Sequence, residues 1–188
     1  MKQGMLVLLS GPSGIGKDVI SDILLKDPQL QLFKSISVTT RPKRDHETDG
    51  KEYYFIDYPT FEEAVKNREL LEYQEFLGHH YGTPRIPEQF MRSLGKHVLV
   101  SVEAQGALQV KHEVPEALSF YLVPKDIDTL ESMIRARRKE DDEVVKQRLH
   151  KANLEMKLGS IFQYEVPIED PAAAAAFIKE KILDFLGN

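Results

Sequence analysis

The residues best suited to chemistry lie in the stretch GPSGIGKD, from Gly11 to Asp18. Phosphate-binding loops follow the pattern G-x-x-x-x-G-K with Ser or Thr next, because backbone N–H groups surround the phosphate, the lysine neutralises it and the hydroxyl binds Mg²⁺. Asp18 occupies the hydroxyl position here, which leaves open a working loop with an altered metal site, a dead loop or a chance string of glycines. The candidate loop consists of Gly11, Pro12, Ser13, Gly14, Ile15, Gly16, Lys17 and Asp18.

The segments on either side of this loop have the patterns that such a loop requires. The apolar run at 5–9 predicts a buried strand that ends at Ser10 and Gly11. Residues 17–25 predict a helix. A strand, a glycine-rich turn and a helix in this order favour a phosphate-binding loop. The apolar face expected on the helix comprises Val19, Ile20, Ile23 and Leu24.

The remaining chain predicts strands that alternate with helices. Residues 126–158 predict two helices broken near the charged run RARRKEDDE, and Asp170 followed by Pro171 predicts the start of a C-terminal helix. Alternating strands and helices favour an α/β fold with a mostly parallel sheet. Further strands are expected at 35–40, 52–56, 70–77, 97–102, 119–123 and 164–168.

Composition narrows the class of protein. The 188 residues are 41% hydrophobic and 29% charged, with a net charge of −5 and no cysteine. A negative balance argues against a general nucleic-acid binder, and the lack of cysteine excludes disulfides and thiolate metal sites. The N-terminal apolar run is too short for a signal-peptide core or a membrane span. We therefore expect a cytoplasmic protein that binds neither nucleic acid nor membranes; the composition indicates no oligomeric state.

Six motifs follow one another in a recognisable order. They are GPSGIGK, SISVTTRPKR with DGKEYYF, LLEY, HYGTPR, AQGA and the arginine-containing region that ends at Arg148 and Leu149. With these motifs the chain resembles guanylate kinases, the P-loop nucleoside monophosphate kinases that transfer a phosphoryl group from ATP to GMP. The resemblance implies a P-loop NTPase core at 1–34 and 97–188, a helical lid at about 126–158 and an inserted GMP-binding lobe at 35–96.

The resemblance assigns residues to the GMP site. Glu72 is expected to accept the guanine N1–H and N2 amine and Thr83 to donate to O6, a pair that would reject adenine. Arginine forks and hydroxyl donors suit a dianionic phosphate. The residues assigned to the phosphate are Ser37, Arg41, Arg44, Tyr53 and Tyr81; Glu103 is assigned to the GMP site, and Glu47 would orient an arginine.

The same resemblance assigns the residues for phosphoryl transfer, which rests on positioning and charge neutralisation. Lys17 would reach the β- and γ-phosphates of ATP, with Mg²⁺ as the accompanying cation. Arg44 acts from the GMP side, and Arg137 and Arg148 match lid arginines that close over the transferring group. Without the resemblance, the charged run near Arg137 would be interpreted as a solvated helix junction. His79 and His80 have no third ligand at metal-binding spacing, so we expect structural roles for them.

Two departures from the family pattern concern the metal. Relatives have a hydroxyl residue at or just after position 18 and an Asp at position 101, whereas this chain has Asp18 and Ser101. One interpretation is an exchange, in which the hydroxyl and the carboxylate have swapped positions around one Mg²⁺ site. The other is drift, in which Asp18 repels the nucleotide phosphates, a cost of roughly 4 kcal/mol for one charge at 4 Å.

Three further departures bear on activity. Glu103 stands where relatives have a second Asp, and Met133 stands where the lid pattern has an Arg. The segment VPIED, residues 166–170, lacks the Asn of the adenine loop. The sequence thus favours an active guanylate kinase that also accepts dGMP. A non-catalytic GMP-binding module and a related kinase with a changed donor remain alternatives.

Overall fold

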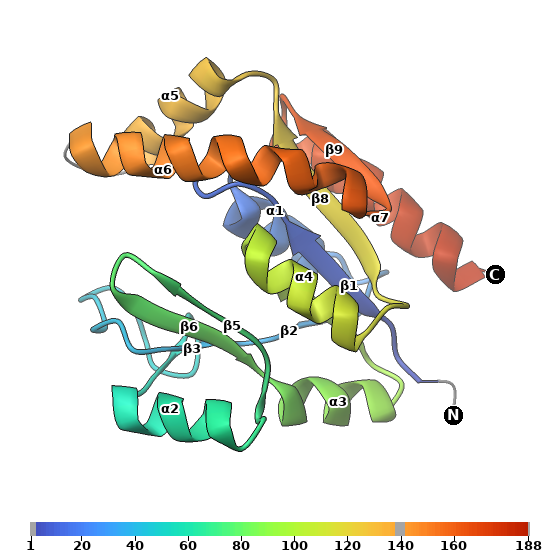
Figure 1. Ribbon diagram of the computed structural model, residues 1–188. Helices are drawn as coiled ribbons and strands as arrows, with labels where there is room; N and C mark the ends of the chain where they lie inside the picture. Colours follow the sequence, from blue (N-terminus) through green and yellow to red (C-terminus); the bar gives the residue numbers. More distant parts are fainter. Residues whose placement is uncertain (1–2, 138–141, 188) are drawn as a thin grey trace.

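The strands form two sheets in the computed structural model, which describes residues 3–137 and 142–187 (Figure 1). The larger sheet has the order β2-β7-β1-β8-β9, and every neighbouring pair in it is parallel. The prediction of an α/β fold with a mostly parallel sheet is therefore confirmed. Its strands are β1 (Leu6–Ser10), β2 (Leu32–Lys34), β7 (His97–Ser101), β8 (Leu118–Pro124) and β9 (Tyr164–Ile168).

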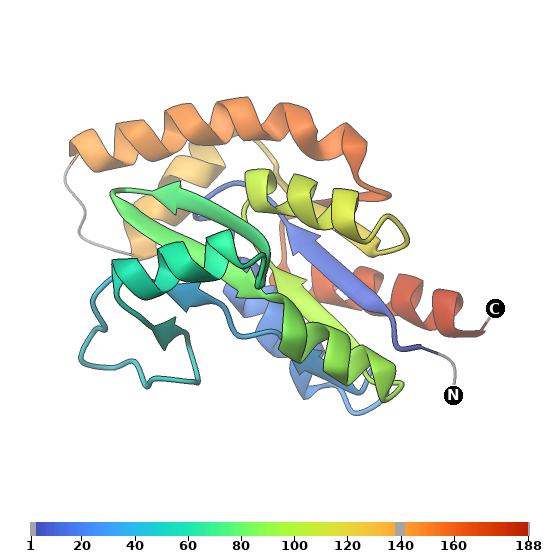
Figure 2. The same cartoon turned by 60° about the horizontal axis from the view of Figure 1, so that its bottom comes forward.

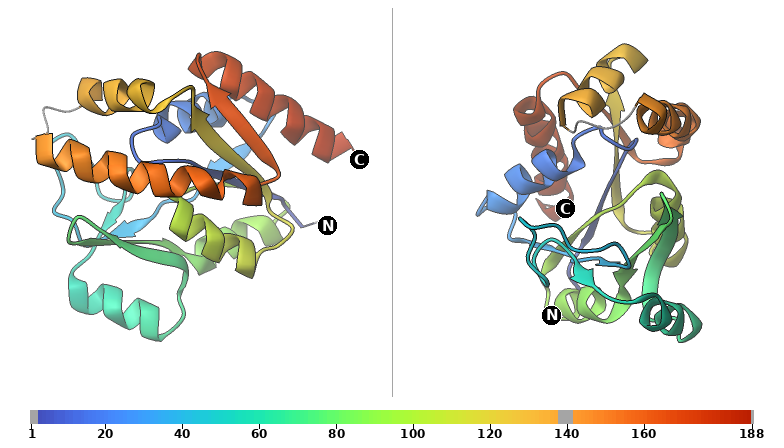
Figure 3. Two further views of the ribbon diagram at one scale, coloured as in Figure 1. Left: turned by 45° about the horizontal axis from the view of Figure 1, so that its top comes forward. Right: turned by 90° about the vertical axis from the view of Figure 1, so that its left-hand side faces the viewer.

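Helices cover both faces of this sheet, which explains why its strands are almost uniformly apolar. On β1, Val7 and Leu9 pack toward α1 (Lys17–Lys26) and α7 (Pro171–Gly187), whereas Leu6 and Leu8 pack toward α4 (Ala104–Glu113). The right-hand view of Figure 3 shows α1 and α7 together on one side of the strands. The β1 strand is buried along its whole length and holds the start of the glycine loop rigidly.

The prediction of the apolar face on α1 is wrong in part. Ile20 and Leu24 are buried, but Val19 and Ile23 are 42% and 39% exposed. Positions 20 and 24 lie one turn apart and face the sheet, while the residues before them point about 100° away around the helix. The row formed by Ile20 and Leu24 is enough to pack this short helix against the sheet.

The smaller sheet has the order β4-β3-β6-β5 and a core of its own beneath α2 (Tyr58–Lys66). The strand expected at 35–40 is confirmed only at 38–39, where β3 joins the smaller sheet, and β2 at 32–34 was not predicted. Residues 35–37 form no strand, because the chain crosses there from the larger sheet to the smaller one. The strands here are β3 (Val38–Thr39), β4 (Tyr54–Phe55), β5 (Leu70–Phe76) and β6 (His79–Pro84).

The remaining helices connect and cover the two sheets. α3 (Arg85–Ser93) leads from β6 back to β7. α5 (Ile127–Arg137) and α6 (Asp142–Glu155), followed by a 3-10 segment (Met156–Ile161), come between β8 and β9, and α6 crosses the top of Figure 1. The division into core, lobe and lid at the predicted boundaries stays a prediction. None of the helices that the structure describes is long and apolar enough to span a bilayer.

Candidate functional site

The glycine loop joins the end of β1 to the start of α1. Gly16 begins α1 with φ +99°, a left-handed conformation that favours glycine. Gly14 has φ +87°, and a Cβ there would lie 2.5 Å from Cγ1 of Ile134 on α5. Because Gly16 has no capping side chain, the first amide groups of α1 are left for an anion at the positive end of the helix.

Lys17 folds back on this loop. Its ammonium donates to the carbonyl oxygens of Gly11 at 2.9 Å and Pro12 at 3.2 Å. Burial lowers the pKa of Lys17, and the nearby carboxylates of Glu103 and Glu155 oppose that shift. The lysine is thus held at the loop by neutral acceptors, which a charged phosphate would outcompete.

Glu72 is a deeply buried carboxylate of the site. It lies on β5 with 2% of its surface exposed, and its Oε1 accepts a 2.7 Å hydrogen bond from the Thr83 hydroxyl. Its Oε2 is buried and has no hydrogen-bond partner among the described residues. Burial raises the pKa of Glu72 to about 7. Gly106 on α4 leaves the necessary space, because a Cβ there would lie 2.3 Å from Oε2.

The Thr83 hydroxyl is engaged within the protein, and its expected donation to guanine O6 stays a prediction. Its hydroxyl donates to Glu72, it is fully buried, and it is absent from the lining of the cavity described below. In this conformation the threonine orients the carboxylate, and a direct bond from Thr83 to a base would require its hydroxyl to turn away.

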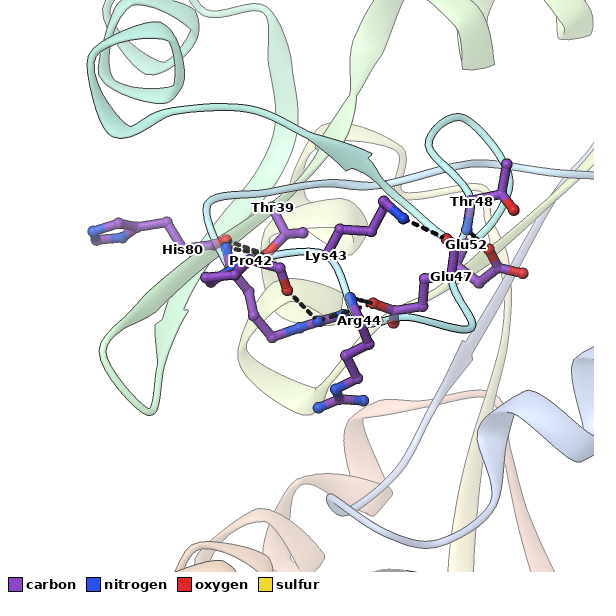
Figure 4. A network of polar contacts seen from close by, with 9 residues as sticks. Thr39, Pro42, Lys43, Arg44, Glu47, Thr48, Glu52 and His80 are labelled. Atoms are coloured by element: carbon purple, nitrogen blue, oxygen red, sulfur yellow. Dashed lines mark hydrogen bonds and ion pairs between the residues drawn. The ribbon is translucent and has the colours of Figure 1, made fainter.

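A second polar cluster, built on the segment after β3, surrounds Glu47 (Figure 4). The Arg41 guanidinium makes a two-pronged contact with Glu47, at 2.7 and 3.0 Å, so the pairing expected of Glu47 is present. Glu47 also accepts the Arg44 backbone N–H at 2.8 Å. The Arg41 guanidinium foremost, with the Arg44 N–H, lowers the pKa of Glu47 to about 2. The Arg44 side chain extends away from this cluster and lines the cavity.

A third cluster joins α6 to the other parts of the chain. The Lys151 ammonium donates to Glu103 and lies 3.6 Å from Oε1 of Glu155. It also lies 4.1 Å from the ring centre of Phe76 at the end of β5. Burial raises the pKa of Glu103, but Lys17 and Lys151 outweigh it and hold that pKa below its usual range. Burial, with Glu103 second, raises the pKa of Glu155.

Sequence reasoning did not identify Lys151. The residue contacts Glu103 across 48 positions, so no local pattern joins the two. One signal was available, because Lys151 lies three residues after Arg148 and therefore on the same face of a helix. Arg148 itself lines the cavity, and its guanidinium lies 5.7 Å from the Phe76 ring centre. Arg137 ends α5, and its side chain lies outside the described part of the structure.

Asp18 and Ser101 lie at or just after the carboxyl ends of two neighbouring strands, β1 and β7. Ser101 ends β7 opposite Leu9 of the neighbouring β1, and Asp18 lies in the first turn of α1. Both side chains line the same cavity. Among the described residues, no three His, Cys, Asp or Glu side chains are grouped as a ready-made metal cage. Any ion here would take a few protein oxygens and complete its shell elsewhere.

One cavity of about 350 Å³ connects these clusters. It extends from the glycine loop, between the two sheets, to the buried Glu72. Among the predicted site residues whose side chains the structure describes, a set that leaves out Arg137, those that do not line it are Gly11, Pro12, Ile15 and Thr83. Those that do are Ser13, Gly14, Gly16, Lys17, Asp18, Ser37, Arg41, Arg44, Tyr53, Glu72, Tyr81, Ser101, Glu103 and Arg148.

Comparison with known proteins agrees with this site. The family model described as guanylate kinase matches residues 3–179. The chain belongs to the guanylate kinase family. It is 41% identical over 184 residues to a guanylate kinase of Thermus thermophilus, covering 98% of this chain and 80% of that protein. It is 39% identical to one of Lactobacillus johnsonii, covering 94% and 87%.

Solved structures place the fold in the same family. The guanylate kinase of Anaplasma phagocytophilum superposes with a TM-score of 0.79 at 26% identity, covering 98% of this chain and 87% of that chain. The SH3-kinase fragment of tight junction protein 3 gives a TM-score of 0.50 at 12% identity, covering 97% and 57%, and supports the fold alone. The predicted membership of the guanylate kinase family, with its nucleoside monophosphate kinase activity, is confirmed.

The segment that differs from the guanylate kinase adenine loop has a structural task. Asp170 follows β9, and its carboxylate accepts the backbone N–H groups of Ala172 at 3.2 Å and Ala173 at 3.0 Å. The predicted cap of the C-terminal helix is therefore confirmed, with Pro171 as the first residue of α7. Met133, the other departure outside the loop, packs against the core beside the buried side chains of α5.

Proposed function

We propose that this chain catalyses ATP + GMP → ADP + GDP and accepts dGMP as a second substrate. The observation that carries the proposal is the single cavity, which joins Lys17 and the start of α1 at one end to the buried Glu72 at the other. A donor bound at the loop and an acceptor bound at Glu72 would meet within it. We also propose that the chain works in the cytoplasm and binds no nucleic acid, in keeping with its net charge of −5.

At the acceptor end, the free Oε2 of Glu72 supplies the recognition. An ionised carboxylate can accept both N–H groups on one edge of guanine, which would also satisfy the orphaned oxygen. Adenine has no N1 proton and would leave that oxygen unpaired. The cost of an unsatisfied buried charge is the reason for expecting strong discrimination between the bases.

The GMP phosphate would bind at the mouth of the lobe. Arg41 is fixed by Glu47, whereas the Arg44 side chain reaches into the cavity. Ser37, Tyr53 and Tyr81 line the same region and supply hydroxyl groups. A GMP oxygen then attacks the γ-phosphorus of ATP, the bond to the ADP oxygen breaks, and the arginines neutralise the charge that is spread over the phosphoryl group.

At the donor end, Lys17 would exchange its carbonyl partners for the β- and γ-phosphates. The α1 amides would bind the same phosphates. Arg148 lines the cavity from α6, and with Arg137 it would close over the transferring group and exclude water.

We propose that Asp18 and Ser101 hold the Mg²⁺ that accompanies ATP. The donor set fits, since one carboxylate and one hydroxyl line the same cavity and Mg²⁺ prefers oxygen ligands with several waters retained. When bound, the ion would neutralise phosphate charge. The shared cavity supports exchange over drift, because a hydroxyl and a carboxylate both line it with their sequence positions swapped.

A double-mutant cycle tests the exchange. Mg²⁺-dependent ATP binding is measured by calorimetry for the parent, Asp18→Ser, Ser101→Asp and the double variant. Exchange predicts that each single change weakens binding and that the double change restores it. Tighter binding by Asp18→Ser alone would show that Asp18 repels the nucleotide and that the site has drifted.

A coupled assay of nucleoside diphosphate release tests the reaction itself. Turnover is measured with GMP, dGMP, AMP, UMP and CMP as acceptors and with ATP and GTP as donors. We expect GMP and dGMP to be the only acceptors that support turnover. Tight GMP binding without turnover for any donor would instead indicate a non-catalytic module, and a preference for another donor would point to the altered segment at 166–170.

A further inference from the structure

The helix α3 buries charged side chains and exposes apolar ones. Its charged residues Glu88 and Arg92 are buried, at 2% and 5% exposure. Ile86 and Phe90 on the helix and Leu94 at its C-cap are 69%, 60% and 46% exposed. Surface helices of globular proteins place such residues the other way round. The helix lies along the lower border of the molecule in Figure 1 and comes forward in Figure 2.

Specific contacts hold α3 in this orientation. Arg92 donates to the Gly4 carbonyl at 2.9 Å, to Glu88 at 3.1 Å and to Glu116 at 2.9 Å. The Gly4 N–H in turn donates to the Arg92 carbonyl at 2.8 Å. The helix therefore cannot roll to bury its apolar side without breaking a buried ion pair, which is strongly unfavourable.

The outward side carries no charge. A chain with 29% charged residues has none among the exposed positions from 86 to 94. The apolar residues are also spaced symmetrically, with Phe90 four residues from Ile86 and four from Leu94. The exposed residues of this face are Ile86, Pro87, Gln89, Phe90, Ser93 and Leu94.

We propose that α3 forms a homodimer interface, with the two-fold axis passing beside Phe90. Two antiparallel copies would then place Ile86 against the partner subunit's Leu94 and bring the two Phe90 rings together. Rows of residues four apart pack into each other in this way, and a two-fold axis requires a self-complementary surface. An uncharged face meets its own copy without repulsion even though each chain carries a net charge of −5.

The size of the face sets the expected strength. A nine-residue helix is about 13 Å long, so the interface is smaller than the roughly 800 Å² per partner of a standard complex. The dimer is therefore expected to dissociate in the micromolar range, with Phe90 as its central anchor. This inference concerns assembly and does not depend on the proposed reaction.

Sedimentation velocity between about 1 and 200 µM, a range that brackets micromolar affinities, tests the proposal. The parent should pass from monomer to dimer as its concentration rises. Phe90→Lys and Phe90→Glu each place like charges together at the axis and should raise the dissociation constant at least tenfold. A mixture of the two variants should dimerise again, because Lys then faces Glu. Phe185→Lys, a change at a 46% exposed Phe on α7, is the matched control and should behave like the parent.

Three results would overturn the proposal. One is a parent chain that stays monomeric throughout the range. Another is a dimer that survives Phe90→Lys, since the interface would then lie elsewhere. The third is a mixture of the Lys and Glu variants that stays monomeric, which would remove Phe90 from the axis. Ile86→Gln, a milder change on the same face, should weaken the dimer without a new charge and guards against misfolded variants.

Discussion

Guanine binding should depend on pH through Glu72. Burial raises the pKa of this carboxylate to about 7, and only its ionised form can accept two N–H groups from the base. At pH 6 about one tenth of the free protein has the ionised form, so the apparent dissociation constant for GMP should be about tenfold higher than at pH 8. Binding at pH 7 should release about half a proton.

The same pKa predicts an effect of opposite sign on stability. The carboxyl titrates near 4.5 when unfolded and near 7 when folded, so the unfolded chain loses its proton first as the pH rises. The free energy of unfolding therefore falls between these values, by about 3 kcal/mol in total above pH 7. Glu72→Gln should raise stability by up to this amount at pH 8 and by almost nothing at pH 4, while it weakens GMP binding.

The assay is isothermal titration calorimetry with GMP from pH 5.5 to 8.5, in two buffers with different ionisation enthalpies. A phosphate monoester titrates near pH 6 itself, so Glu72→Gln is measured with the same ligand as the control. The ratio of parent to variant affinity isolates the carboxylate. If this ratio is the same at pH 6 and pH 8, Glu72 is either ionised throughout or away from the base, and the reasoning fails.

Three other substitutions test the clusters around the cavity. Gly106→Ala should weaken GMP binding at least tenfold and leave the affinity for ATP unchanged, because the new Cβ would displace Oε2 of Glu72. Equal losses of affinity for both nucleotides would argue against this local cause. Glu47→Gln should lower the free energy of unfolding, measured by urea titration, by about 2 kcal/mol at pH 7 and by less at pH 3. The reason is that the ionised carboxylate beside Arg41 contributes stability only above its low pKa. Lys151→Met should lower the free energy of unfolding by about 2 kcal/mol at pH 7 and by less at pH 4, because loss of the cation raises the folded-state pKa of Glu103 and Glu155. An equal loss at both pH values in urea titrations would contradict this.

Sequence patterns were sufficient to predict those parts of the fold that depend on neighbouring residues in the chain. The buried strand, the glycine turn and the following helix are contiguous, and Asp170 caps α7 within three residues, so both were predictable. The short strand β2 and the crossing to β3 were not, because tertiary pairing in two different sheets decides where these strands begin and end. The helix α3 was not predicted, and its periodicity would have placed Ile86 and Phe90 inward, because apolar sides of surface helices normally face the core.

The site was predictable to the extent that the family resemblance supplied it. Residues such as Arg41 and Glu47 came from matched motifs, and their contact is present. The resemblance assigned Thr83 to the base, whereas its hydroxyl is engaged by Glu72 across a β-ladder that no linear motif describes. Lys151 lay in no motif at all, and only the packing of α6 against β5 and α4 gives it a place beside Phe76 and Glu103.

The charges around the glycine loop determine how Asp18 affects the binding of ATP. Lys17 and Lys151 face Glu103 and Glu155, so that cluster is already balanced and has little positive charge to spare for ATP. Asp18 adds a further negative charge at the first turn of α1, where the helix end would otherwise favour an anion. An intermediate dielectric makes one such charge at 4 Å worth roughly 4 kcal/mol against a phosphate. A cation between Asp18 and the phosphates reverses the sign of that contribution, so ATP binding by this chain should depend on Mg²⁺ more steeply than in Asp18→Ser, which lacks the charge.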